Sequence, residues 1–493
     1  MKLADTKKTE SVIFTIFKME LLDHFQRFRF TFITMLSILL IIVATIINVE
    51  NYRQKLDNYL SASRQHKESL KNVKVYSRLN PNIEHKPEVL EILSQGITGQ
   101  FSPTVNVQRT RMPEFKPGST VDNEYLAVIF EIDISYVISV IFSLMGLLLA
   151  FDAINGDRRN GNLKMILANR VHRYKVLIAK SLGGISILSI SLAFGFICCM
   201  LVMINSPGIM LDSGDWLRIG GLFISSLIYA SLFYMLGLLL SAIAREPATA
   251  LAFSLFFWVV LVIIWPGAVR YFGKQLFPIP SLEYLQRNEE YQQLDTDEIY
   301  KLYGNFHEAG SGGGMISVSG DGTLTFNSMG GRFPPPDQDK LNFLIKKAEE
   351  INEVIQEQND REWQIRANYV TQQMRQYRII HIISSFSPAY LYAHITSILS
   401  RTDIGSYSTF MEHIYEFRSQ IIQWLNDIDA IHSQKWFVEA GELDLNGLSE
   451  FSTPRIPFRE CLSHILLPVS ELLFLTIVLF LIAHVVFLRN DVS

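Results

Sequence analysis

Six long apolar segments constrain most strongly how this chain can fold. A helix rises about 1.5 Å per residue, so about 20 apolar residues are needed to cross ~30 Å of hydrocarbon. Backbone amides and carbonyls cannot stay unpaired in lipid, so each segment is predicted to be a transmembrane helix. The predicted spans are residues 30–47, 134–151, 181–204, 219–244, 247–269 and 465–488.

The composition agrees with a chain that is largely solvated by lipid. Charged residues make up 19% of its 493 residues, and the mean hydropathy is +0.20, whereas soluble proteins contain about 25% charged residues. A formal net charge of −4 gives no indication of nucleic-acid binding. Three cysteines are too few for a disulfide framework.

Basic residues predict which side of the membrane each end faces. They cluster before the first span and between the second and third spans, and short loops rich in Lys and Arg stay in the cytoplasm. The two clusters are Lys7, Lys8, Lys18, Arg27 and Arg29, and then Arg158, Arg159, Lys164, Arg170, Arg173, Lys175 and Lys180. With six spans, both termini are then cytoplasmic. The fold class predicted is an α-helical polytopic membrane protein with two extracytoplasmic domains, residues 48–133 and 270–464, the second mainly helical.

The first 29 residues are predicted to contain an amphipathic cytoplasmic helix. Apolar residues recur there at steps of three and four, with charged residues off that line. The apolar residues are Phe14, Phe17, Leu21, Phe25 and Phe28. The pattern fits a helix lying in the membrane interface, and it also fits a helix packed on the rest of the protein.

The cytoplasmic loop, residues 152–180, resembles the coupling loop of permease subunits of type-two ABC exporters. The matching residues are Phe151-Asp152, Gly156-Asp157-Arg158-Arg159, Gly161-Asn162-Leu163, Arg173 and Lys180. The family usually has glutamate where Asp157 stands and threonine where Asn162 stands. The resemblance implies a coupling helix that docks into a groove of an ATPase, with Asp152, Gly156, Asp157, Arg158, Arg159, Gly161, Leu163, Arg173 and Lys180 as docking residues. The alternative is that the basic residues only enforce topology and bind anionic lipid.

The resemblance also implies the partners and the location. The chain has no Gly-x-x-x-x-Gly-Lys-Ser/Thr motif, so a nucleotide site has to be on a separate ABC ATPase subunit, which would hold ATP and Mg. No cofactor is expected in this chain. Six helices make a thin pore wall, so a second permease is expected, either an identical copy or a sister chain. The location implied is a bacterial inner membrane, with membrane lipid as a further partner and an extracytoplasmic protein as a candidate partner.

The second outer segment is predicted to contain two long helices. Residues 337–381 contain neither Gly nor Pro and carry apolar residues at helical spacing. A second stripe runs from Phe410 to Ile431, with a capping box at Thr409 and Glu412, and the two stripes are expected to face each other. A break at Ser387-Pro388 precedes a short apolar helix, residues 390–400.

A further resemblance sharpens the family. The strings Ser387-Pro388-Ala389, Thr402-Asp403, Ser406-Tyr407, Phe410 and Tyr415-Glu416-Phe417-Arg418 are similar to a subgroup of these permeases with a long insertion before the last span. Residues 105–112 alternate in a way that permits a strand, and residues 317–326 suggest a small hairpin.

Glu471 is the candidate for a polar lining of a transport path. A carboxylate within a span is costly and marks a functional site by default, although Glu471 is merely interfacial if hydrocarbon begins at Leu472. His381 could meet His394 or His413 by folding, but the sequence carries no catalytic or metal-binding motif. An alternative function is a membrane sensor or assembly scaffold whose outer helical domain binds a partner without ATP-driven transport.

Overall fold

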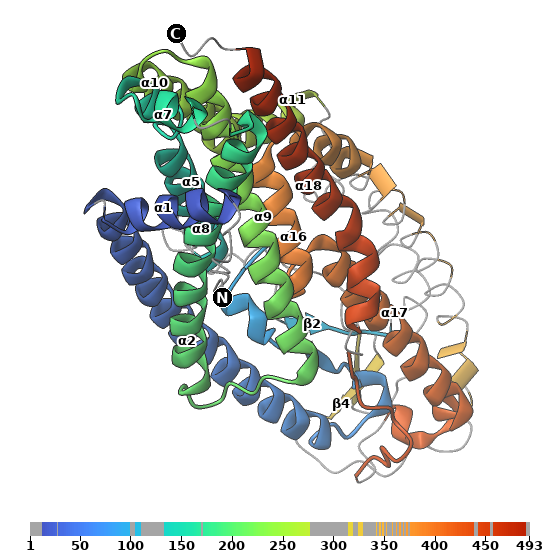
Figure 1. The fold of residues 1–493 in the computed structure, drawn as a ribbon. Coiled ribbons are helices and arrows are strands. Elements are labelled where there is room, and N and C mark those ends of the chain that lie inside the picture. Colours follow the sequence, from blue (N-terminus) through green and yellow to red (C-terminus); the bar gives the residue numbers. More distant parts are fainter. Residues whose placement is uncertain are drawn as a thin grey trace, which may run out of the picture.

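The computed structural model describes residues 12–26, 28–98, 104–109, 133–168, 171–276, 314–318, 324–328, 375–437, 442–453 and 457–489, with scattered positions between 342 and 372. Within these residues six helices are long and apolar enough to cross a membrane, as the sequence predicts. They form one bundle (Figure 1). The protein is therefore an α-helical, multi-pass membrane protein.

The spans follow the chain in order, and two of them contain a π-helical turn. The first is in α2 (Phe28–Lys71), and the second comprises α4 (Ile134–Val137), η4 (Ile138–Phe142) and α5 (Ser143–Ala150). The third and fourth are α8 (Arg173–Ile204) and α9 (Ser213–Ile243). The fifth comprises α10 (Pro247–Trp258), η5 (Val259–Ile264) and α11 (Trp265–Leu276), and the sixth is α18 (Phe458–Arg489).

Helix ends follow from local chemistry. Asp212 and Asp215 form a reciprocal capping box that starts α9, and Pro247 occupies the first turn of α10, where its missing N–H costs nothing. The polar residues after the first span continue as helix to Lys71, so α2 projects beyond the apolar stretch.

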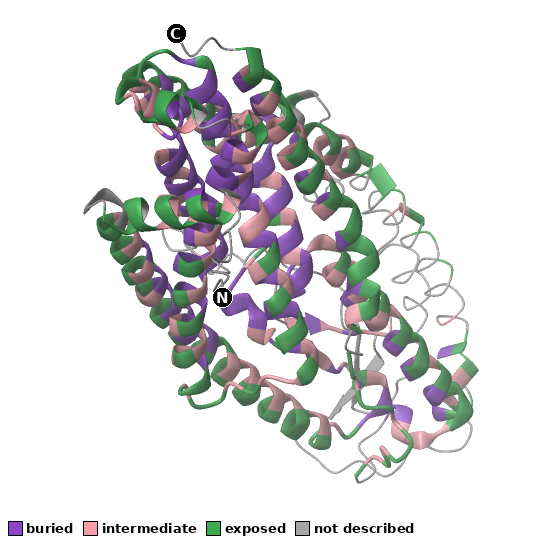
Figure 2. Ribbon diagram, viewed as in Figure 1, coloured by how far each residue is buried: buried purple, intermediate pink, exposed green. Residues whose placement is uncertain are grey.

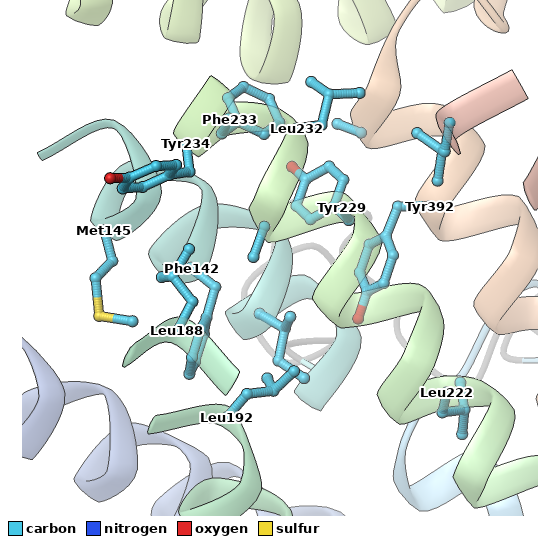
Figure 3. Packing of buried hydrophobic residues seen from close by; sticks show 14 of the residues in the cluster. Phe142, Met145, Leu188, Leu192, Leu222, Tyr229, Leu232, Phe233, Tyr234 and Tyr392 are labelled. Atoms are coloured by element: carbon cyan, nitrogen blue, oxygen red, sulfur yellow. The ribbon is translucent and has the colours of Figure 1, made fainter. Parts of the chain in front are cut away.

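Helix α9 is the centre of the bundle. It packs against α5, α8, α16 and α18, and most of its surface is buried (Figure 2). Tyr229, Phe233 and Tyr234 are fully buried on it and point into the core between helices (Figure 3). Gly146 lets α5 approach closely, since a Cβ there would lie 2.8 Å from the carbonyl oxygen of Ala230. The core is thus fixed by close packing around one buried helix.

Helix α1 (Val12–Gln26) combines both sequence interpretations of the amphipathic segment. Ile16 is buried against Val176 and Ala179 at the start of α8. Phe14 and Phe25 remain 52% and 44% exposed. One face therefore packs on the bundle, while apolar side chains on another remain available to the membrane interface.

The two predicted outer segments share one hydrophobic cluster. The first contributes Tyr76, Leu79, Ile83, Val105 and Val107, and the second contributes Ala348, Trp436, Phe437 and the buried face of α17 (Ile404–Asp427). Ala348 lies in the same cluster as Phe410 and Ile414, as expected for facing stripes; most of residues 337–374 lies outside the described residues. The small elements here are η1 (Tyr76–Arg78), β1 (Asn82–Glu84), η2 (Val89–Ile92), β2 (Thr104–Asn106), η7 (Ala430–His432) and η8 (Gln434–Trp436).

Both expected strand regions are present among the described residues. Strand β2 pairs antiparallel with β1, with Val105 opposite Ile83. Strands β3 (Gly314–Val318) and β4 (Leu324–Ser328) form the predicted antiparallel hairpin. The predicted capping box at Thr409 and Glu412 is wrong. Helix α17 begins earlier, because the side chain of Asp403 accepts a hydrogen bond from the Gly405 N–H and caps the first turn.

Helix α16 (Pro388–Ser400) lies inside the bundle and not apart from it. Ser387 caps it and donates a hydrogen bond of 2.7 Å to the carbonyl of Leu261, in the middle of the fifth span. Tyr392 stacks on Tyr229 of α9, with ring centroids 4.6 Å apart. The helical residues 375–384 precede it, so the two arms form a hairpin whose turn reaches the middle of the spans.

The stability of the region formed by the two predicted outer segments should change with pH because of His85. Its ring packs edge-on against Phe410 at 4.6 Å, and burial lowers the pKa of His85 from its usual value. Because the unfolded chain then takes up the proton more readily, stability falls as the pH drops below about 6.5 towards the folded pKa, by ~1.4 kcal/mol for each unit of pKa difference.

The measurement compares thermal unfolding at pH 7.5 and 5.5 in detergent. His85→Phe should lose less stability on acidification than the unchanged protein does. His413→Gln, at a half-buried histidine of α17, serves as the control and should behave like the unchanged protein. An equal acid sensitivity in His85→Phe would contradict the assignment.

Candidate functional site

The loop between the second and third spans folds into two short helices. Helix α6 (Asn155–Arg159) and helix α7 (Asn162–Ala168) meet at Gly161, whose φ of 75° is in the left-handed region that favours glycine. Asn162 is the first residue of the second helix. The loop is therefore a compact helical turn between α5 and α8.

A buried cluster of three charges holds this turn. The Lys180 side chain is 3% exposed, and its Nζ lies 2.5 Å from Asp157 Oδ2 of α6 and 2.5 Å from Glu20 Oε1 of α1. A buried ammonium group has to be paired, so the cluster fixes α1, α6 and α8 relative to one another. Glu20 was not indicated by the sequence, because it lies 160 residues from Lys180.

Two further contacts join the turn to the centre of the bundle. The backbone N–H groups of Ile154 and Asn155 donate to Ser241 Oγ at the end of α9, at 3.0 and 3.2 Å. Leu163 of α7 is fully buried in the main core. The turn is thus attached directly to α9 and to the main core.

The sequence-predicted docking residues differ in how far they are exposed. Asp157, Leu163 and Lys180 point into the protein, while Asp152, Gly156, Arg158 and Gly161 are half-buried. Arg159 is exposed, and so are Asn162, Lys164 and Met165, which the prediction did not include. Met165 is 65% exposed. The inward residues therefore support the turn, and the exposed group is the surface that another protein could reach.

Arg173 joins the loop to the last span. Its Nη1 donates to the carbonyls of Phe487, at 3.2 Å, and Leu488, at 2.8 Å. These carbonyls belong to the last turn of α18, which lacks intrahelical donors. Arg173 thus acts as a side-chain cap and ties α18 to the start of α8.

Glu471 lies beside the hairpin formed by residues 375–384 and α16. It is half-buried on α18, and its carboxylate is close enough to His381 for their charges to interact. His381 Nδ1 is 2.9 Å from the Tyr390 hydroxyl, and its ring lies 4.6 Å from the ring of His394. Of the two pairings that the sequence left open, the structure shows His381 with His394. No three metal-binding side chains come together among the described residues.

A second buried charged cluster lies at the opposite end of α9 and was not indicated by the sequence. Arg218 is fully buried and donates to the carbonyl of Leu399, at 3.2 Å. Arg401, whose side chain is 8% exposed, contacts Glu88 at 3.1 Å and Asp215 at 3.6 Å. The cluster joins α9, the end of α16 and the first outer segment. The sequence signal for this cluster was the position of Arg218, a charged residue directly before the predicted fourth span.

Family comparison decides how this architecture is classified. The model of the ABC-2 family transporter proteins matches residues 14–323, well over half of the chain. The chain belongs to the ABC-2 transporter family. The matched region contains α1, the loop helices α6 and α7, and five of the six spans.

Curated relatives of this ABC-2 protein carry permease names. A protein of Stutzerimonas stutzeri named "Probable ABC transporter permease protein NosY" is 28% identical over 185 residues, which cover 36% of this chain and 64% of the relative. The protein of the same name from Pseudomonas aeruginosa PAO1 is 28% identical over 190 residues, with the same coverage. The chain therefore spans somewhat less than two thirds of these relatives.

Proposed function

We propose that this chain is the permease subunit of an ATP-binding-cassette exporter in a bacterial inner membrane, driven by a separate ATPase docked on the α6–α7 turn. The observation that carries the proposal is the rigid attachment of that turn to three helices of the bundle in an ABC-2 protein. ATP and Mg bind to the ATPase and not to this chain. Both termini of this chain lie in the cytoplasm, on the same side as the turn.

The proposed mechanism follows the contacts of the turn. ATP-driven closure of the ATPase pushes on the exposed face around Met165. The Asp157–Lys180–Glu20 cluster and the Ser241 hydrogen bonds carry the displacement to α1, α8 and α9. Because packed helices shift as rigid bodies, the displacement changes access along the bundle.

Two parts of the proposal concern the rest of the complex. The fifth span leaves large apolar side chains exposed, including Phe253 and Phe256, and we propose that it faces the second permease, an identical copy or a sister chain. Glu471 lines the transport path beside His381. Unchanged transport and unchanged ATPase activity in Glu471→Gln would remove Glu471 from the path.

Met165→Asp tests docking on the turn. An unpaired carboxylate that docking would bury costs several kcal/mol, so we expect at least a tenfold loss of co-purifying ATPase. Met210→Asp is the matched control. Met210 is 84% exposed and lies in the connection between α8 and α9, at the end of the bundle away from the turn. Full retention of the ATPase by Met165→Asp would contradict docking here. Absence of any ATPase from the unchanged complex would favour the sensor or scaffold alternative.

A further inference from the structure

A cavity of about 740 Å³ opens where the end of α18 meets the start of α8. Its walls come from α7, from the segment that leads into α8, and from the last turns of α18. The lining residues are Lys164, Val171, His172, Arg173, Tyr174, His484 and Leu488. The cavity is open to its surroundings, so it could hold the headgroup of a larger molecule whose remainder stays outside.

The charge of the lining is one-sided. It contains a lysine, an arginine and two histidines but no carboxylate. The Arg173 guanidinium holds two of the walls together through the last carbonyls of α18. His484 Nδ1 is buried without a hydrogen-bond partner among the described residues. The cavity therefore offers positive charge and an unused polar atom to an anion.

The surroundings of the cavity are apolar and point to a lipid. Leu481, Val485 and Leu488 are 53%, 47% and 49% exposed on α18. Their spacing of four and three residues places them on one helix face that leads into the cavity. Tyr174, 44% exposed at its rim, has the amphipathic character of residues at a membrane interface. A free anion would make no favourable contact with this apolar stripe, whereas a lipid acyl chain would.

We propose that the cavity binds the phosphate of an anionic phospholipid of the inner leaflet, with an acyl chain along the Leu481–Val485–Leu488 stripe. Lys164 and His484 contact the phosphate, and Arg173 positions the walls. Basic pockets between spans on the cytoplasmic side are suited to such headgroups. The lipid would bridge the loop and the last span, so its binding would stiffen the connection that Arg173 makes.

Native mass spectrometry of the purified full-length chain tests the site, using dioleoyl phosphatidylglycerol and dioleoyl phosphatidylcholine as probes. The unchanged protein should bind phosphatidylglycerol at least tenfold more tightly than phosphatidylcholine. Lys164→Ala, and Lys164→Ala combined with His484→Gln, should reduce that preference several-fold. Arg159→Ala should leave it intact, since Arg159 is an exposed basic residue of the same loop outside the cavity.

Each other outcome overturns the assignment. An equal affinity for the two lipids, or an undiminished preference in both variants, would show that the cavity is not a lipid site. An equal loss in Arg159→Ala would show diffuse surface charge. Displacement of phosphatidylglycerol by millimolar inorganic phosphate would indicate a free-anion site. Because lipid binding is measured without the ATPase, its failure leaves the proposed function untouched.

Discussion

Replacing Lys180 by methionine is expected to lower the free energy of unfolding by about 3–5 kcal/mol, because it leaves two half-buried carboxylates without their cation. Asp157 and Glu20 both lie 2.5 Å from the Lys180 Nζ, and their side chains are 21% and 16% exposed. The loss should be measured as reversible unfolding in mixed micelles. The same variant should also uncouple the turn, so ATPase activity should no longer respond to the permease.

Two further variants show whether the loss of stability comes from the ion pairs of Lys180. Lys164→Met makes the same change at an exposed lysine on α7 and should cost less than about 1 kcal/mol. Combining Lys180→Met with Glu20→Gln and Asp157→Asn removes all three charges and should recover part of the lost stability, since neutral groups are less costly to bury than unpaired charges. A Lys180→Met protein as stable as the unchanged one would contradict the role of the cluster.

Arg401→Met is expected to have the second largest effect, again about 3–5 kcal/mol, because Asp215 is buried and loses a cationic partner. Arg401 also contacts Glu88, so the variant should loosen the first outer segment from α9 and α16. Its φ of 58° disfavours arginine and methionine alike, so the backbone cost is matched. Limited proteolysis should cleave the first outer segment faster in the variant.

An exposed ion pair provides the comparison for Arg401. Arg53 contacts Glu50 at 3.3 Å with its side chain 43% exposed, and Arg53→Met should cost no more than about 1 kcal/mol. A double-mutant cycle with Glu88→Gln then isolates the Arg401–Glu88 contribution. Equal losses of stability in Arg401→Met and Arg53→Met would show that the buried cluster stabilises the protein no more than an exposed ion pair does.

The sequence predicts the spans and the loop well because both depend on local signals. Hydrocarbon thickness fixes the length of an apolar run, and Gly161 between two short helices is a local turn. The sequence could not show that Lys180 pairs with Glu20, or that Ser241 accepts bonds from α6, because those contacts join residues far apart in the chain. Asp157 is one of the predicted docking residues, and nothing in the sequence indicated that its carboxylate pairs with the buried Lys180 ammonium.

The hairpin around α16 illustrates the same limit. The break predicted at Ser387-Pro388 is present, with Ser387 as the N-cap of α16, yet the sequence of this short apolar helix gave no indication of where it packs. Only the contacts with Tyr229 and Leu261 place it among the spans. The cap of α17 was missed because Asp403 and Thr409 both suit an N-terminus, and the Asp403 hydrogen bond decides between them.

Labelling of Met165→Cys tests the central claim most directly, in a background where Cys198, Cys199 and Cys461 are replaced by alanine. A membrane-impermeant maleimide should leave this variant unlabelled in intact cells, label it in inverted vesicles, and fail to label it once the ATPase is bound. Met210→Cys should show the opposite sidedness. Labelling of Met165→Cys from outside intact cells would contradict an ATPase-docking turn on the cytoplasmic face.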